Sequence, residues 1–295
     1  MYDLVDTISY KKAMIWFGPS GNSEKFYKDG NKKSHQMPQW LNEMGLNAYE
    51  YQCNKGTNIK KQTAQQIGEE AKKYNIRMSI HAPYYINLSS RDEVKRKNSI
   101  QYILNTLEIA KWMGADRIVI HPGSIGKFTR DEALALALPI LTEAIKKADE
   151  SGFSDITLCP EVLGKLSNLG SLDEVIMMCQ LDERMIPCVD FGHIHARTLG
   201  GLNTAEDFNK VFDKIENKLG RERTEKLHIH FSKVEFTQAG EKKHRTLQES
   251  QFGPNFEPLA EVLIKRNIEP VVICESRERM AEDAVILKQI YQSLK

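Results

Sequence analysis

The sequence lacks long apolar segments and an excess of charge of either sign. No run of about 18 apolar residues occurs, and the first residues, MYDLVDTISYKK, contain no apolar core of a secretory signal. We therefore expect a soluble cytoplasmic protein with no membrane partner. The 41 Lys and Arg residues nearly balance the 40 Asp and Glu residues. This balance excludes a basic field over the whole protein, so any basic surface that binds nucleic acid must be local.

Paired cysteines and glycine-rich phosphate loops are also missing. The five cysteines are odd in number, scattered along the chain and free of any CxxC pair. This pattern argues against a disulfide framework or a zinc ribbon and favours reduced thiols in the cytosol. The sequence has no GxGxxG or Walker motif, which removes the main reason to expect a dinucleotide-binding fold. No low-complexity linker divides the chain, so we expect one domain over residues 1–295.

Eight short apolar or β-branched runs are present, and segments of good helix formers alternate with them. The predicted strands lie at 13–18, 47–52, 77–83, 117–123, 155–161, 186–192, 226–232 and 270–276. Eight strand–helix units in one chain of this length predict an α/β fold, a closed (β/α)8 TIM barrel. Two stretches without a clear element, 18–36 and 233–258, are candidate functional loops.

Polar side chains recur where these predicted strands end. In a TIM barrel the carboxyl ends of the strands face the active site, so these side chains should converge on one mouth. They are His81, His121, Glu161, Asp190, His193, His228, His230 and Glu275, and His244 follows in the next loop. Imidazoles and carboxylates gathered in this way would repel one another or lose hydration without a cation between them. The pattern therefore predicts a metal site.

The mixture of ligand types limits which metal ions and which reactions are expected. Imidazole nitrogen with carboxylate oxygen suits Zn²⁺, Mn²⁺ or Fe²⁺. One zinc ion takes about four ligands, so this set is large enough for two or three ions, which favours phosphoester hydrolysis. Taken singly, a histidine at a strand end is more often structural. His230 shares a strand face with His228 and could be an extra ligand or a donor behind it. His35 and His195 lie outside the pattern, and we interpret them as ordinary polar residues.

The motifs resemble the endonuclease IV family of apurinic/apyrimidinic endonucleases, in the same order along nearly the whole chain. They are HAPYYINL (81–88), HPGS (121–124), PE (160–161), DFGH (190–193), HIHFSK (228–233) and CES (274–276). The resemblance implies a zinc-dependent enzyme of base excision repair that cleaves damaged double-stranded DNA at abasic sites, with no obligate protein partner.

The resemblance also implies roles for individual residues. A first zinc would be held by His81, His121 and Glu161. Glu161 would bridge to a second zinc, held also by Asp190, His228 and Glu275. A third would be held by His193, His244 and an aspartate two residues before His244. Catalysis would depend on Glu161, Glu275 and His193.

Two departures from the family pattern affect these expectations. Lys242 stands where the third-zinc aspartate is expected, and a protonated lysine cannot bind a metal. Glu241 is adjacent, but a regular strand would point it to the other side, so two or three ions are expected. The loop after the second strand, CNKGTNIKKQ (53–62), has lysines but no arginine. Lys55, Tyr84 and Tyr85 are the expected DNA contacts.

Two alternatives remain open from the sequence. The first is a sugar isomerase or epimerase on the same barrel, with one ion on Glu161, Asp190, His228 and Glu275. In that enzyme His81 and His121 would contact substrate hydroxyls. The second is a weakly catalytic or non-catalytic DNA-binding relative, which Lys242 and the altered loop suggest. The number of bound ions and metal-dependent incision would separate these alternatives.

Overall fold

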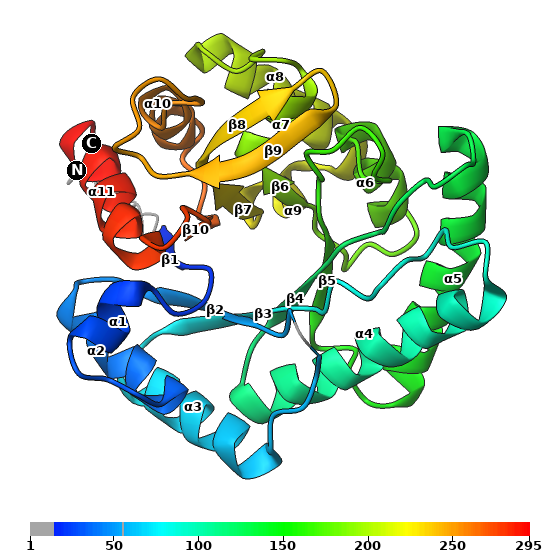
Figure 1. The fold of residues 1–295 in the computed structure, drawn as a ribbon, viewed down its shortest axis with the longest axis horizontal. Coiled ribbons are helices and arrows are strands. Elements are labelled where there is room, and N and C mark those ends of the chain that lie inside the picture. The colour runs from blue at the N-terminus through cyan, green and yellow to red at the C-terminus, as the bar shows by residue number, and fades with distance from the viewer. Residues whose placement is uncertain (1–14, 55) are drawn as a thin grey trace, which may run out of the picture.

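The structure, a computed structural model, describes residues 15–54 and 56–295. Within these ranges, eight parallel strands form a central barrel that helices surround (Figure 1). The strands are β1 (Trp16–Pro19), β2 (Ala48–Gln52), β3 (Arg77–His81), β4 (Arg117–Ile120), β5 (Thr157–Pro160), β6 (Cys188–Asp190), β7 (His228–Phe231) and β10 (Val271–Cys274). The predicted (β/α)8 TIM barrel is confirmed, although residues 13 and 14 of the first predicted strand lie outside the described ranges.

The barrel closes through two four-stranded sheets that meet at two seams. One sheet has the order β1-β10-β7-β6 and the other β2-β3-β4-β5. Single parallel bridges join them, from Ser20 to Glu50 and from Glu161 to Cys188. At the first seam a Cβ atom on Gly18 would lie 1.8 Å from the Ala48 carbonyl oxygen, so the close approach of β1 and β2 requires glycine.

The helices of the described ranges have capping side chains at five of their amino ends. They are α1 (Glu24–Lys28), α2 (Met37–Glu43), α3 (Lys61–Lys73), α4 (Glu93–Met113), α5 (Arg130–Glu150), α6 (Leu172–Cys179), α7 (Phe191–Arg197), α8 (Ala205–Leu219), α9 (Arg221–Glu225), α10 (Glu257–Arg266) and α11 (Met280–Ser293), with a 3-10 turn η1 (Ser34–Gln36). Capping boxes start three of them, with Thr129 before α5, Ser171 before α6 and Thr204 before α8. No helix in the described ranges is long and apolar enough to span a membrane.

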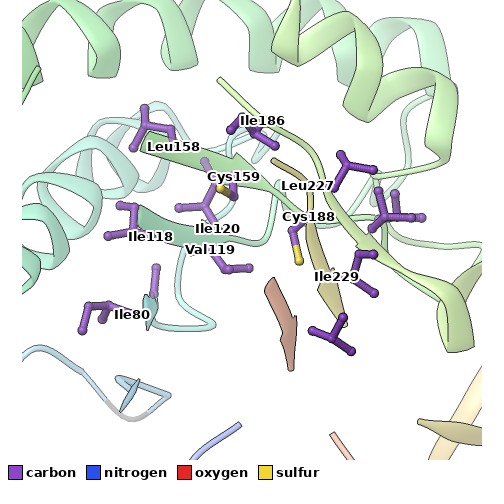
Figure 2. Close-up of a cluster of buried hydrophobic side chains, with 14 of the residues drawn as sticks. Ile80, Ile118, Val119, Ile120, Leu158, Cys159, Ile186, Cys188, Leu227 and Ile229 are labelled. Atoms are coloured by element: carbon purple, nitrogen blue, oxygen red, sulfur yellow. The ribbon is translucent and has the colours of Figure 1, made fainter. Parts of the chain in front are cut away.

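The core lies between the strands and the helices that cover them, and inside the barrel away from the carboxyl ends of the strands. Figure 2 shows Ile118, Val119 and Ile120 of β4 in a cluster of buried side chains that also includes Cys188 of β6 and Ile229 of β7. All five are fully buried. Strands covered on both faces read as continuous apolar runs, which is why the sequence marks them clearly. Polar side chains are therefore concentrated where the strands end.

The two stretches predicted as loops contain regular structure. The first, 18–36, includes the end of β1, helix α1 and the turn η1. The second, 233–258, contains an antiparallel hairpin of β8 (Lys233–Thr237) and β9 (Gly240–Arg245), which packs against α7 (Figure 1). Gly240 adopts a φ of 93°, which suits the tight turn between the two strands. Helical and strand periodicity are hard to recognise in such short, mostly polar segments.

Candidate metal centre

The predicted ligands come together at the carboxyl end of the barrel. His81 and Asp190 are the last residues of β3 and β6, while His121, Glu161 and Glu275 directly follow β4, β5 and β10. Three groups of these side chains have ligand atoms within 4.8 Å of one another. The groups are His81, His121 and Glu161; Glu161, Asp190, His230 and Glu275; and Asp190, His193 and His244. The barrel register therefore assembles a cluster from residues that are far apart in the sequence.

Glu161 lies at the centre of this cluster, and its two carboxylate oxygens face different histidines. Its Oε2 is 2.8 Å from His121 Nε2 and 3.3 Å from His81 Nε2. Its Oε1 is 3.4 Å from His193 Nδ1 and 3.4 Å from His230 Nδ1. The side chain is only 1% exposed. A carboxylate with His81 and His121 at one oxygen and His230 at the other has the arrangement needed to bridge two ions.

Backbone carbonyls fix the orientation of two of these rings. His81 Nδ1 is 2.9 Å from the Ala82 carbonyl oxygen, and His193 Nδ1 is 2.9 Å from the Val162 carbonyl oxygen. A carbonyl oxygen can only accept, so each Nδ1 carries the proton and each Nε2 offers its lone pair to the cluster. This partnership behind the ring is the usual support of a metal-binding histidine.

The structure corrects the expected histidine of the second ion. His230, and not His228, faces the carboxylates, since its Nδ1 lies 3.4 Å from Glu161 Oε1 and 3.5 Å from Glu275 Oε1. In the strand register His230 is level with Asp190, whereas His228 is level with Cys188, one layer deeper in the barrel. Residues two apart share a strand face, so the sequence alone could not distinguish these two histidines.

Glu50 is a buried acid beneath the cluster that the sequence analysis missed. It lies on β2, and its Oε2 is 2.8 Å from His228 Nε2. Its Oε1 is 3.1 Å from His230 Nε2. Burial raises the pKa of Glu50, but the two imidazoles outweigh burial and hold it well below the ordinary value. An acidic residue in the otherwise uncharged run NAYEYQ is the signal that could have identified it.

A β-bulge places Glu241 where the aspartate was expected. Glu235 pairs with Lys243 and the next residue, Phe236, pairs with Glu241, so Lys242 is an extra residue in β9. The bulge returns Glu241 to the face of His244, and Lys242 instead pairs with Glu235 at 2.6 Å. The expectation that Glu241 would point away is wrong, because it assumed a regular strand.

Glu241 approaches both histidines of the third predicted site. One of its carboxylate oxygens is 3.8 Å from His193 Nε2, and the other is 3.9 Å from His244 Nε2. Gly164 leaves room for this approach, since a Cβ atom there would lie 2.4 Å from Glu241 Cβ and 2.8 Å from His193 Cδ2. The third predicted site therefore has an acidic side chain, Glu241, beside its two histidines.

The chemistry of the cluster fits metal ions. Among the described residues, Asp190 Oδ2 and both ring nitrogens of His230 are buried with no hydrogen-bond partner, and Asp190 Oδ2 and His230 Nδ1 face the other ligands. The Nε2 atoms of His193 and His244 are 3.3 Å apart. Two imidazole nitrogens bound to one tetrahedral zinc at about 2.0–2.1 Å would lie at about this separation. Zinc or a similar ion would provide the missing partner of Asp190 Oδ2 and of His230 Nδ1.

The charges of the cluster shift its pKa values in opposite directions. Burial, with the charges of Glu275 and Glu161, raises the pKa of Asp190 to about 6 against the opposing charges of His193 and His244. Burial lowers the pKa of His193, but the charges of Asp190 and Glu161 outweigh it and raise the value to about 10. Burial lowers the pKa of His121, which favours the neutral ring that can bind a metal. Burying several carboxylates this close together is unfavourable unless a positive charge lies among them.

The two predicted aromatic contacts have different surroundings. Tyr84 is 54% exposed, and its ring lies 4.9 Å from that of His121 at the mouth of the site. Tyr85 is also exposed, but its ring packs 5.7 Å from Tyr102, away from the ligands. Lys55, the third expected DNA contact, lies outside the described residues. Tyr84 is therefore the better placed aromatic group.

The mouth forms a cavity of about 380 Å³ that combines metal-site acids with basic side chains. Its lining includes two acids, Glu241 and Glu275, together with His244 and Tyr84. It also includes two basic side chains, Lys243 and Arg277. Such a cavity can receive an anionic group beside the cluster. His195 is not part of it; its ring is buried, its Nδ1 accepts the backbone N–H of Leu202, and it packs against Phe236.

Comparison with known sequences shows the family of the chain. A family model for xylose isomerase-like TIM barrels matches residues 38–291. An uncharacterized protein of Methanocaldococcus jannaschii is 33% identical over 86% of this chain and 90% of its own length. A probable endonuclease 4 of Mycoplasma pneumoniae is 32% identical over 66% of this chain and 66% of its own length. For a probable endonuclease 4 of Mycoplasma genitalium, the match at 32% identity spans 55% of that protein.

Solved structures share the fold at low sequence identity. Endonuclease IV from Thermus thermophilus superimposes with a TM-score of 0.66 at 19% identity, over 95% of this chain and 99% of that one. A D-tagatose 3-epimerase-like protein gives a TM-score of 0.67 at 19% identity, over 84% of this chain and 89% of that one. Barrels with different chemistry are therefore equally similar in shape, so function must be argued from the site.

Proposed function

Since the chain belongs to the xylose isomerase-like TIM barrel family, we propose that it is a metal-dependent phosphodiesterase that cleaves double-stranded DNA at abasic sites. The observation that carries this proposal is the position of Glu161, whose two oxygens face two different groups of imidazoles. This arrangement suits more than one ion. The similarity to probable endonuclease 4 sequences supports DNA as the substrate.

The residues that would hold the ions follow from the three groups of side chains. His81, His121 and Glu161 would hold the first ion. Glu161, Asp190, His230 and Glu275 would hold the second, and His193, His244 and Glu241 the third. Zinc suits this mixture, while Mn²⁺ or Fe²⁺ would also fit the ligand types. Ions held there would supply Lewis acidity and positive charge to a phosphodiester.

Side chains of the protein would bind the DNA and transfer the protons. Lys243 and Arg277 line the mouth and would attract the phosphate, and Tyr84 would pack against the exposed face of the DNA beside the missing base. Glu275 or Glu161 would orient a water, and Glu275 would accept its proton as the water oxygen bonds to phosphorus. The bond from phosphorus to the 3′ oxygen breaks, and His193, by holding the third ion, would help to stabilise the charge that develops there. These three residues are the catalytic groups of the proposal.

A single-ion sugar isomerase or epimerase is the second candidate. It is favoured by the four-residue group of Glu161, Asp190, His230 and Glu275, which could hold one ion by itself, and by the shape shared with epimerase structures. That enzyme would leave His81 and His121 for substrate hydroxyls. The close approach of both rings to Glu161 is better explained by a second ion.

The test is incision of a duplex that contains one abasic-site analogue. The wild-type chain should cut the damaged strand 5′ to the lesion, leave undamaged duplex intact, and lose activity by more than 100-fold in Glu161→Gln. Glu174→Gln is a matched control, because Glu174 is also a buried, ion-paired glutamate but lies on α6 with Arg130. Absence of incision by wild-type protein loaded with zinc or manganese would contradict the proposal.

A further inference from the structure

Glu50 connects the deep layer of the barrel to the candidate metal centre. We propose that Glu50 is a positioning residue that holds His230 with its Nδ1 toward Glu161 and Glu275, and so sets the affinity of the second ion. The inference rests on the metal centre of the proposed function. It concerns a residue on the opposite side of His230 from the ion, with no contact to the substrate.

Glu50 is itself held in place by three other side chains. The Ser79 hydroxyl donates to Oε2 at 3.0 Å, and Gln52 Nε2 donates to Oε1 at 3.2 Å. His228 Nε2 lies 2.8 Å from Oε2. Glu50, Ser79, His228 and His230 are almost fully buried, with exposures between 0% and 2%. These contacts hold the carboxylate with Oε1 beneath His230.

The ring of His230 lies between two sets of acids. Its Nε2 is 3.1 Å from Glu50 Oε1, while its Nδ1 is 3.4 Å from Glu161 Oε1 and 3.5 Å from Glu275 Oε1. The contact with Glu50 does not have the geometry of a hydrogen bond, but the ionised carboxylate 3.1 Å away favours a proton on Nε2 by its charge. That tautomer leaves the Nδ1 lone pair free on the side of the ion-binding acids. A carboxylate behind a metal-binding histidine acts in this way.

A role in stabilising the fold alone does not explain why the buried residue at position 50 is a charged glutamate. A buried carboxylate is costly to desolvate, and an apolar side chain of similar volume would usually stabilise a barrel interior as well or better. His228 pairs with Glu50 Oε2, while Oε1, which accepts from Gln52, also lies 3.1 Å from His230 Nε2. The arrangement is therefore explained by the need to orient His230.

The experiment compares zinc binding by wild-type protein, Glu50→Gln and Glu174→Gln in competition with a chromogenic chelator. Glutamine keeps the shape of Glu50 but has one acceptor oxygen and no charge. We expect Glu50→Gln to weaken one ion by about 10–100-fold and to leave the ion on His81 and His121 unchanged. Glu174→Gln should lower stability without changing the affinity of any ion. Nitrogen-15 NMR of the histidines should show the His230 Nδ1–metal signal lost in Glu50→Gln alone.

The outcomes separate this inference from the proposed function. If wild-type protein binds ions but does not incise abasic DNA, and Glu50→Gln weakens one ion, the positioning role holds while the proposed function fails. If folded Glu50→Gln binds every ion as tightly as wild type, the positioning role is overturned, even if incision is confirmed. A wild-type chain that binds no ion overturns both.

Discussion

Glu241 and His244 lie on the same side of β9 although they are three residues apart, because Lys242 is an extra residue in a β-bulge. Both therefore face His193. Bulges recur next to active sites, where they redirect a side chain. Here the bulge converts the sequence EKKH into an acid and a histidine on one face, which supports a third metal site.

The first prediction concerns this third site. Glu241→Gln should remove one ion per chain or weaken it by about 10–100-fold, because a neutral amide is a poorer ligand than a carboxylate. Lys242→Ala is the control, since the Lys242 side chain points to Glu235 and is 59% exposed. Metal content after gel filtration measures both. Equal metal content in Glu241→Gln and wild type would exclude Glu241 as a ligand.

The second prediction separates the two histidines of β7. His230→Gln should lose the second ion, because His230 Nδ1 faces Glu161 and Glu275. His228→Gln should keep the wild-type number of ions, with at most a several-fold weaker affinity, because His228 contacts only Glu50 among the acids of the centre. Elemental analysis of both variants distinguishes them. The reverse result would restore the expectation drawn from the sequence.

The third prediction concerns Tyr84 and Tyr85, the two aromatic residues in the loop after β3. Tyr84→Ala should reduce incision about tenfold or more, since aromatic stacking in nucleic-acid sites contributes about 1–3 kcal/mol. Tyr85→Ala should change incision less than threefold, because its ring packs on Tyr102 away from the mouth. Incision rates at low DNA concentration test this difference. Equal losses in the two variants would argue against a specific role for Tyr84.

The fourth prediction concerns stability and pH at Glu174. Arg130 Nε donates to Glu174 Oε1 at 2.7 Å, and the Gly170 and Ser171 backbone N–H groups donate to Oε2 at 2.8 Å each. Burial raises the pKa of Glu174, but these donors outweigh it and lower the net value. Glu174→Gln should therefore lower the free energy of unfolding by about 1.5–3 kcal/mol at pH 7.

The pH dependence of this difference follows from the lowered pKa. The stabilisation is complete above the unfolded glutamate pKa of about 4.3 and is lost as the pH falls through the lower pKa of the folded state. Urea unfolding of wild type and Glu174→Gln should thus differ at pH 7 and converge toward pH 3. A difference that persists unchanged at pH 3 would show that charge is not the cause.

The sequence was sufficient for the barrel and for much of the centre. Strands such as β4 are buried on both faces, so their apolar runs stand out, and the polar residues after them, such as His121 and Glu161, mark the active end. These residues extend from strand ends that the fold places together. Their convergence follows from the topology alone.

The remaining residues depend on details that a sequence pattern does not contain. Whether His228 or His230 reaches the centre is decided by the register of β6 and β7. Glu241 depends on a bulge that adds one residue, and a single-residue shift reverses the face of every side chain. Glu50 lies beneath the mouth and not at a strand end, so a search for polar strand ends passes over it.

The most direct test of the central claim is the number of bound ions and DNA incision measured on the same sample, before and after chelation. We predict two or three zinc or manganese ions per chain, loss of incision when they are removed, and recovery when they return. One ion per chain, no incision of abasic duplex at any metal loading, and conversion of a ketose or aldose would contradict the claim and identify a sugar isomerase or epimerase.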